Sequence, residues 1–222
     1  MTALNYLLTP EGVALSMDTL AIDSKDKIPI KMVTKFIVIP NINCIICGTG
    51  NFNAIVDWFA WVQKNIICVG IYQLNKLTAQ VLPDFMKKYN GNNVCTIYQF
   101  GLDEIDKKFH GYVYRSTDKF ISEEIQYGLS VKPYDAFSVT DGMLNIEEHI
   151  SYDDGIEEIF YKLMQIQKEY DDNLEVNERV GIGGMVEVVI LKKDYISIRN
   201  YKYFDDYEDT YKKMILNLNK RA

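Results

Sequence analysis

The amino-acid sequence predicts an α+β fold in which two β-sheets pack together with helices on the outside. Strand-like segments occupy residues 3–47 and are followed by helical segments, and this order recurs between residues 94 and 217. Apolar residues make up 48% of the chain and charged residues 25%, which is ordinary for a globular protein. At 222 residues, the chain is expected to form one domain, residues 1–222, around a full core.

The charge balance and the hydropathy pattern exclude several function classes. The net charge is −7 and the pI is about 4.9, whereas a surface that coats nucleic acid is expected to be basic. The first residues carry no basic segment before an apolar run, and no apolar stretch reaches membrane-spanning length. We therefore expect a cytoplasmic protein without a nucleic-acid or membrane partner.

Cys44 and Cys47 form a CxxC pair within a segment that reads as a strand. Side chains three residues apart on a strand point to opposite faces, so the two thiols are expected to diverge. No second pair follows at zinc spacing. We interpret these thiols, with Cys68 and Cys95, as reduced side chains that pack as small apolar groups.

The first strand-rich part begins with a predicted hairpin. Residues 3–8 and 13–17 are β-prone and flank the turn Thr9-Pro10-Glu11-Gly12. Such a hairpin returns Asp18 to the start of the chain. Two further strands are predicted at residues 31–39 and 42–47, after a polar loop at 23–30.

Two helices are predicted next. Ile55, Trp58, Phe59 and Val62 fall on one face of a helix spanning residues 53–64. A second helix is predicted over residues 74–89, with Pro83 expected to kink or split it.

The second half repeats the pattern, although residues 134–149 show no clear periodicity. An amphipathic helix is predicted over residues 155–170, with acidic residues crowding its first turns as the helix dipole favours. The remaining predictions are strands at 94–100, 111–116, 120–127, 185–191 and 195–201, and a helix at 206–217.

The residues that suggest chemistry lie around the amino terminus. Removal of Met1 would make Thr2 the first residue, giving a hydroxyl nucleophile and an α-amine base in one residue. Lys35 would lower the pKa values of both groups by its charge, and Asp18 would hold the lysine in place. The backbone N–H of Gly48, at the end of a neighbouring strand, would face a developing oxyanion.

Each of these residues also has an ordinary structural interpretation. Asp18, at a strand end, is the kind of residue that starts a turn, and many chains begin with Met-Thr. Lys35 is harder to assign to structure alone, because a lysine inside an apolar strand needs a partner. The functional hypothesis rests on the four positions taken together.

The same stretches carry a resemblance to a known family. Ala14-Leu15-Ser16-Met17-Asp18-Thr19, the strand Val33-Thr34-Lys35-Phe36-Ile37 and Ile45-Ile46-Cys47-Gly48-Thr49-Gly50 resemble the catalytic segments of proteasome β subunits and the bacterial HslV peptidase. The resemblance covers residues 2–64 in motif and spacing, and the rest in topology. It implies a four-layer αββα sandwich of the N-terminal nucleophile (Ntn) hydrolase class.

The later motifs of that family are altered in this sequence. Leu129 stands where the family carries a supporting serine, with Ser130 as the substitute if the register shifts by one residue. Arg179 and Ile182 stand where the family carries an aspartate and a serine. The glycines around these positions are retained.

The resemblance implies a threonine-type peptidase with the catalytic residues Thr2, Asp18, Lys35, Gly48 and Ser130 and no cofactor. It also implies a peptide or protein substrate, a homo-oligomeric ring and an ATPase unfoldase as a further partner. The alternatives are a catalytically inactive structural or assembly protein and a free-standing amidohydrolase that acts on a small molecule. A metal site is not expected, since neither His110 nor His149 has a second histidine at ligand spacing.

Overall fold

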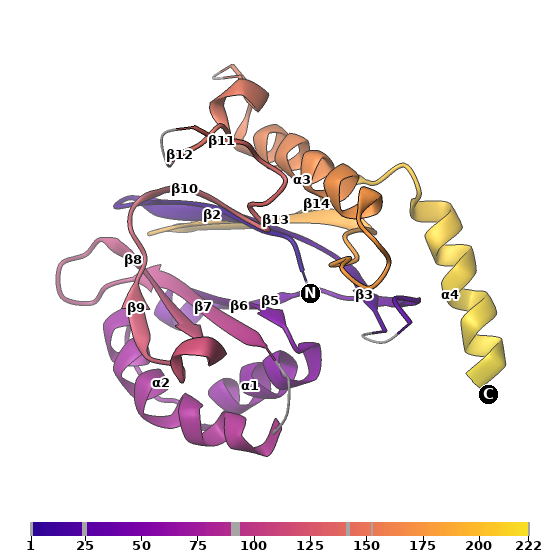
Figure 1. The fold of residues 1–222 in the computed structure, drawn as a ribbon. Coiled ribbons are helices and arrows are strands. Elements are labelled where there is room, and N and C mark those ends of the chain that lie inside the picture. The colour runs from indigo at the N-terminus through magenta and orange to yellow at the C-terminus, as the bar shows by residue number, and fades with distance from the viewer. Residues whose placement is uncertain (1, 24–25, 90–93, 141–142, 152, 222) are drawn as a thin grey trace.

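Two five-stranded antiparallel sheets lie face to face in the computed structural model, which describes all residues except 1, 24–25, 90–93, 141–142, 152 and 222 (Figure 1). The lower sheet of Figure 1 has the order β5-β6-β7-β8-β9, and the upper sheet has the order β10-β1-β2-β13-β14. The lower-sheet strands are β5 (Phe36–Ile39), β6 (Cys44–Gly50), β7 (Cys95–Leu102), β8 (Phe109–Arg115) and β9 (Ser122–Glu124). The upper-sheet strands are β1 (Leu4–Thr9), β2 (Gly12–Asp18), β10 (Gly128–Lys132), β13 (Met185–Lys192) and β14 (Tyr195–Tyr203).

Shorter elements lie in the connections between these strands and the helices. Two small antiparallel pairs are β3 (Leu20–Ile22) with β4 (Pro29–Met32), and β11 (Val139–Thr140) with β12 (Met143–Leu144). The 3-10 turns are η1 (Pro40–Ile42), η2 (Lys87–Tyr89), η3 (Ser116–Asp118) and η4 (Glu147–His149).

The predicted N-terminal hairpin is confirmed. In β1 and β2, Thr9 pairs with Gly12 across the turn and Leu4 pairs with Met17 at the open end. The hairpin therefore returns Asp18 to the first residues of the chain, as the turn chemistry predicts.

Two strand predictions were wrong in their extent. The single strand expected over residues 31–39 is divided into β4 and β5, and Thr34 and Lys35 lie between them, outside the ladder. Of the strand expected over 120–127, only β9 forms, and the next strand, β10, begins at Gly128 in the other sheet. Local apolar content predicts strand-forming segments but does not say which sheet each one joins.

Helices α1 (Phe52–Asn65) and α2 (Ile71–Met86) cover the outer face of the lower sheet (Figure 1). The side chain of Asn51 caps α1 by accepting a hydrogen bond from Ala54 N. The predicted apolar face of α1 is buried, but Pro83 does not split α2, which runs through it as one element.

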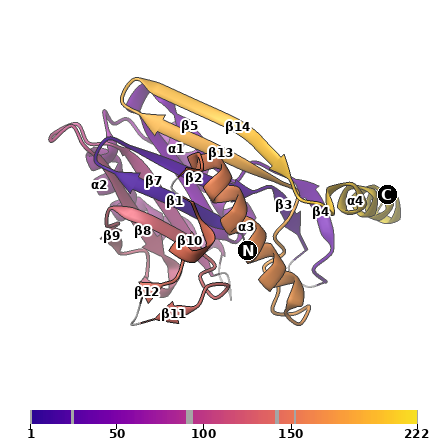
Figure 2. The same cartoon turned by 90° about the horizontal axis from the view of Figure 1, so that it is seen from above.

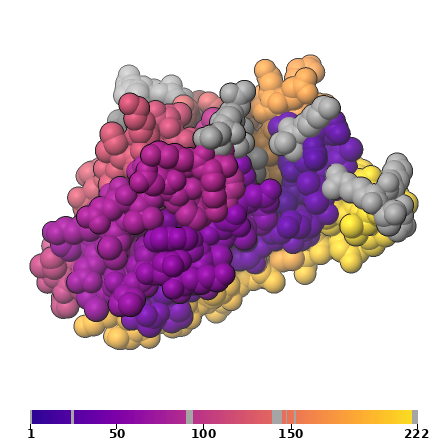
Figure 3. All heavy atoms as spheres, turned by 90° about the horizontal axis from the view of Figure 1, so that it is seen from below, coloured from indigo at the N-terminus to yellow at the C-terminus, as the bar shows by residue number. Residues whose placement is uncertain are grey.

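Helix α3 (Ile156–Asn173) lies across β1, β2, β13 and β14 on the outer face of the upper sheet. Helix α4 (Tyr207–Arg221) packs instead beside β4, at one end of the molecule (Figures 1 and 2). The space-filling view from below shows the same yellow segment beyond the mass of α1 and α2 (Figure 3). Among the described residues, no helix has the length and hydropathy that crossing a membrane requires.

The expected four-layer αββα Ntn sandwich was therefore wrong. The described residues form mostly antiparallel sheets with four helices, of which α3 packs on the outer face of the upper sheet. The predicted C-terminal helix exists as α4, but it packs against β4 and not on the outer face of a five-stranded sheet.

The main core lies between the two sheets. Alternate residues of β1 and β2 face the β6, β7 and β8 side chains, and the fully buried members include Leu15, Ile45 and Phe100. Cys47 belongs to this core, whereas Cys44 belongs to the core beneath α1 and α2, so the predicted divergence of the CxxC thiols is confirmed. Burial raises the pKa of both thiols, which agrees with packing roles.

Phe100→Ala tests the inter-sheet core. The side chain is 0% exposed, so truncation should lower the free energy of unfolding by about 3–5 kcal/mol in urea denaturation. Ile105→Ala is the control, because its side chain is 66% exposed and its loss should change stability by less than about 0.5 kcal/mol. Equal effects of the two substitutions would contradict the assigned core.

Candidate functional site

A buried ion pair joins the two sheets at the N-terminal end of the chain. Lys35 Nζ lies 2.9 Å from Asp18 Oδ1 and donates a second hydrogen bond of 2.7 Å to the carbonyl of Leu20. The side chains are 3% and 0% exposed. Burial lowers the pKa of Lys35, while the charge of Asp18 and its hydrogen bond act in the opposite direction. The sequence prediction that Asp18 anchors Lys35 agrees with this geometry.

Asp18 also holds the start of β1. Its Oδ1 accepts a hydrogen bond of 3.0 Å from Ala3 N, and its Oδ2 accepts one of 3.3 Å from Gly183 N. One carboxylate therefore links the first residues, the loop before β13 and the catalytic lysine candidate. Several N–H donors hold a carboxylate in a fixed orientation.

Thr2 directly precedes this anchored residue and is 7% exposed. Its hydroxyl forms no hydrogen bond with any residue that the structure describes. The Ala3 amide that follows it donates a hydrogen bond to Asp18. The structure thus brings Thr2, Asp18 and Lys35 to one end of the molecule. The nucleophilic role of Thr2 remains a prediction.

Gly48 lies on β6 next to this cluster. Phe36 pairs with Cys47, so the register continued by one residue places Lys35 beside Gly48. A Cβ at position 48 would lie 2.9 Å from Ile55 Cγ1 and 3.0 Å from the Thr96 carbonyl. Close packing of α1 on the lower sheet therefore explains the glycine without a catalytic role, and the oxyanion role stays a prediction.

Ser130 is not brought to Thr2. It pairs with Tyr6 in the β1–β10 ladder, and four residues along a strand correspond to about 13 Å. Leu129 pairs with Leu7 and packs at the edge of the core beneath α3. Neither position supplies a polar group beside the nucleophile candidate.

Asp171 is a site residue that sequence reasoning missed. Its carboxylate accepts hydrogen bonds from three consecutive amides, Val180 N at 2.5 Å, Gly181 N at 2.8 Å and Ile182 N at 3.2 Å. These contacts shape the loop whose next amide, Gly183 N, reaches Asp18. An acidic residue in the last turn of a helix opposes the helix dipole, and that signal was available in the sequence.

The two altered family positions in this loop have structural roles. Arg179 donates hydrogen bonds from Nε to the carbonyl of Leu174 and from Nη2 to the carbonyl of Asp172, at the C-terminal end of α3. Ile182 is buried in the apolar core beneath α3. The polar support of the loop therefore comes from Asp171 rather than from position 179 or 182.

Glu187 is a second missed residue. It is 8% exposed, and its Oε1 accepts a hydrogen bond of 2.9 Å from the hydroxyl of Thr34. Its Oε2 is buried and has no hydrogen-bond partner among the described residues. Burial raises the pKa of Glu187 and Asp18 adds to the rise, whereas Thr34 and Lys35 oppose it. The charge of Lys35 therefore acts on two carboxyl groups, those of Asp18 and Glu187.

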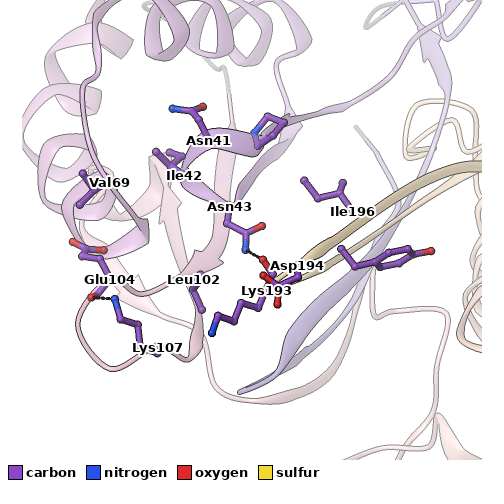
Figure 4. Close-up of a pocket in the computed structure, with 12 residues that line it drawn as sticks. Asn41, Ile42, Asn43, Val69, Leu102, Glu104, Lys107, Lys193, Asp194 and Ile196 are labelled. Carbon is purple, nitrogen blue, oxygen red and sulfur yellow. Dashed lines mark hydrogen bonds between the residues drawn. The ribbon is translucent and has the colours of Figure 1, made fainter.

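A surface pocket with a volume of about 590 Å³ lies away from this cluster (Figure 4). It is lined by the β5–β6 turn and the β13–β14 turn, where Asn43 Nδ2 donates a hydrogen bond of 2.9 Å to the Lys193 carbonyl. On the β2–β13 ladder, Asp18 pairs with Val186 and Gly12 pairs with Lys192, six residues or about 20 Å further along. The pocket and the Thr2 cluster occupy opposite ends of the sheets.

Asp171→Asn should lower the free energy of unfolding by about 1–3 kcal/mol, because at least one of the three buried amides loses its acceptor. Urea denaturation measures the change. Asp172→Asn is the matched control, since its carboxylate is 52% exposed and its loss should cost less than about 1 kcal/mol. Equal costs would show that the amide contacts of Asp171 contribute nothing.

Glu187→Gln should change stability in a pH-dependent way. The raised pKa means that Glu187 stabilises the fold below its ordinary value of 4.5, and that this contribution is lost as pH rises through the folded-state pKa. The variant should therefore gain stability relative to the unmodified chain as pH rises above 4.5 in urea denaturation. Thr34→Val removes the hydroxyl that lowers the pKa and should move this transition to higher pH. A stability difference that is constant with pH would contradict the assignment.

Comparison with known proteins gives structural neighbours only. No family model and no curated protein matches the chain. A (Gly-1) mutant of Anbu from Hyphomicrobium sp. strain MC1 superposes with a TM-score of 0.65 at 11% identity, over 99% of this chain and 94% of that one. Anbu (ancestral beta-subunit) from Yersinia bercovieri superposes with a TM-score of 0.57 at 10% identity, over 99% and 97% of the two chains.

These neighbours correct the predicted family. The chain was expected to belong with proteasome β subunits and HslV, and two solved structures that it resembles are instead Anbu proteins. At 10–11% identity the similarity shows the fold alone. The chain is therefore similar to Anbu proteins in the arrangement of its sheets and helices.

Proposed function

We propose that this chain is a threonine-type amide hydrolase in which Thr2 is the nucleophile after removal of Met1. The observation that carries the proposal is the Asp18 carboxylate, which holds both the Lys35 ammonium and the amide next to Thr2. This contact keeps the lysine charge and the start of the chain at one end of the sheets.

The chemistry follows from the groups at this end. Asp18 and Leu20 accept two of the three hydrogens on Lys35 Nζ, and in the proposed mechanism the third is donated to the hydroxyl of Thr2. The positive charge favours the alkoxide that attacks an amide carbonyl. The free α-amine of Thr2, with a reference pKa of about 7.7–8.0, would take the hydroxyl proton and later give it to the leaving amine.

A second candidate function is a non-catalytic subunit of an assembly. Ser130 lies opposite Tyr6 and so away from Thr2, and an apolar side chain, Ile182, stands where the family carries a serine. The name of one structural neighbour, an ancestral beta-subunit, describes a subunit. We propose a homo-oligomer under either function, and the native mass of the purified chain tests it.

Labelling with a β-lactone, followed by intact mass measurement, separates the two functions. We expect loss of Met1 and one covalent adduct on the processed chain, because only a free N-terminal threonine carries its own base. Thr2→Ala should give no adduct. Thr117→Ala should label as the unmodified chain does, because Thr117 is exposed on η3.

The contrary results are equally clear. A processed chain without an adduct, or an adduct that persists in Thr2→Ala, would sink the hydrolase proposal. Retention of Met1 in protein from the native host would favour the non-catalytic subunit.

A further inference from the structure

A cluster of one histidine and three carboxylates lies at the β7–β8 connection, away from the Thr2 end. Asp103 follows β7, Asp106 lies in the turn, His110 lies on β8 and Glu124 lies on β9. Leu102 and Glu104 of the same connection line the pocket shown in Figure 4. The sheet therefore brings together residues that the sequence separates by up to 21 positions.

The histidine has one nitrogen oriented by a carboxylate and the other turned to the cluster. His110 Nδ1 lies 2.8 Å from Glu124 Oε1, and Nε2 lies 3.0 Å from Asp106 Oδ2. One ligand atom each from Asp103, Asp106 and His110 lie within 4.8 Å of one another. Ligands bound to one ion at about 2.0–2.2 Å lie roughly 3–3.5 Å apart, so a small contraction suffices.

Asp103 supplies an independent observation. Its side chain belongs to a residue that is 6% exposed, and its Oδ1 accepts hydrogen bonds from Ile105 N and Asp106 N. Both of these donors go to Oδ1, and no residue in the described part of the chain donates a hydrogen bond to Oδ2. Oδ2 is therefore the Asp103 oxygen that remains for a cation, while Oδ1 holds the turn.

The electrostatic environment is negative. Asp103, Asp106, Glu124 and Glu11 all act on the Tyr127 hydroxyl in the same direction and raise its pKa, after burial as the larger cause. Lys108 faces Asp106, and Lys107 Nζ is engaged with the Glu104 carbonyl. These lysines offset only part of the carboxylate charge around His110.

We propose that Asp103, Asp106 and His110 bind a divalent transition-metal ion of the Zn²⁺ class, with Glu124 orienting the imidazole. Two carboxylate oxygens and one imidazole nitrogen suit Zn²⁺ with water in the remaining position. A carboxylate on the other ring nitrogen fixes the tautomer, as is usual for histidine ligands. The ion would replace the proton shared between His110 and Asp106 and would join the β7–β8 connection to β8.

The sequence concealed this site because its ligands are mostly carboxylates. The rejection of metal binding rested on the absence of a second histidine at ligand spacing. The fold supplies the other ligands from the turn before His110, at positions 103 and 106.

Titration of the chelator-treated full chain with ZnCl₂ in a calorimeter tests the proposal. We expect one ion per chain, at least tenfold weaker binding in His110→Gln, and unchanged binding in His149→Gln. The chain has two histidines, so His149, which is exposed on η4, is a matched control. Glu124→Gln should weaken binding by roughly tenfold to a hundredfold while retaining every ligand.

A second ligand variant guards against misfolding of the histidine variant. Asp106→Asn removes a partly exposed ligand, and Asp118→Asn on η3 is its control. Absence of one-to-one binding, or equal affinity in the unmodified chain, His110→Gln and Asp106→Asn, would overturn the site. His110 would then be an imidazolium held between two carboxylates.

Discussion

The Asp18–Lys35 ion pair is the interaction on which the N-terminal end of this structure depends. Both side chains are removed from water, so each charge is acceptable only because the other is present. Asp18 also accepts hydrogen bonds from Ala3 N and Gly183 N. Together with the bond from Lys35, these contacts link β1, the loop before β13 and the β4–β5 connection to one carboxylate. Removal of either charge would leave the other buried and unpaired.

The two ends of the face-to-face sheets differ in chemistry because of this pair. The middle of the sandwich is apolar, whereas the end that holds Thr2 contains Asp18, Lys35, Thr34 and Glu187. With Glu187, this end contains two carboxyl groups beside the single ammonium group of Lys35. Asp171 holds the loop whose Gly183 amide contacts Asp18. Such unfavourable burial of charge is typical of a functional site, and it gives the hydrolase proposal its physical basis.

Local patterns predicted the parts of the fold that local contacts decide. The β1–β2 hairpin followed from its turn residues, the α1 face followed from its periodicity, and both are confirmed. The division of residues 120–132 between two sheets and the docking of α4 on β4 depend on contacts distant in sequence. For the same reason Asp18 and Lys35 were foreseen through a hairpin and a neighbouring strand, while Asp171 and Glu187 were not.

A double-mutant cycle on Asp18→Asn and Lys35→Met tests the central claim most directly. Each single substitution should lower the free energy of unfolding by about 3–5 kcal/mol, because it strands the opposite charge. The double variant should lose clearly less than the sum, since no unpaired charge remains. Additive losses in urea denaturation would show that the two side chains do not depend on each other, and would contradict this account.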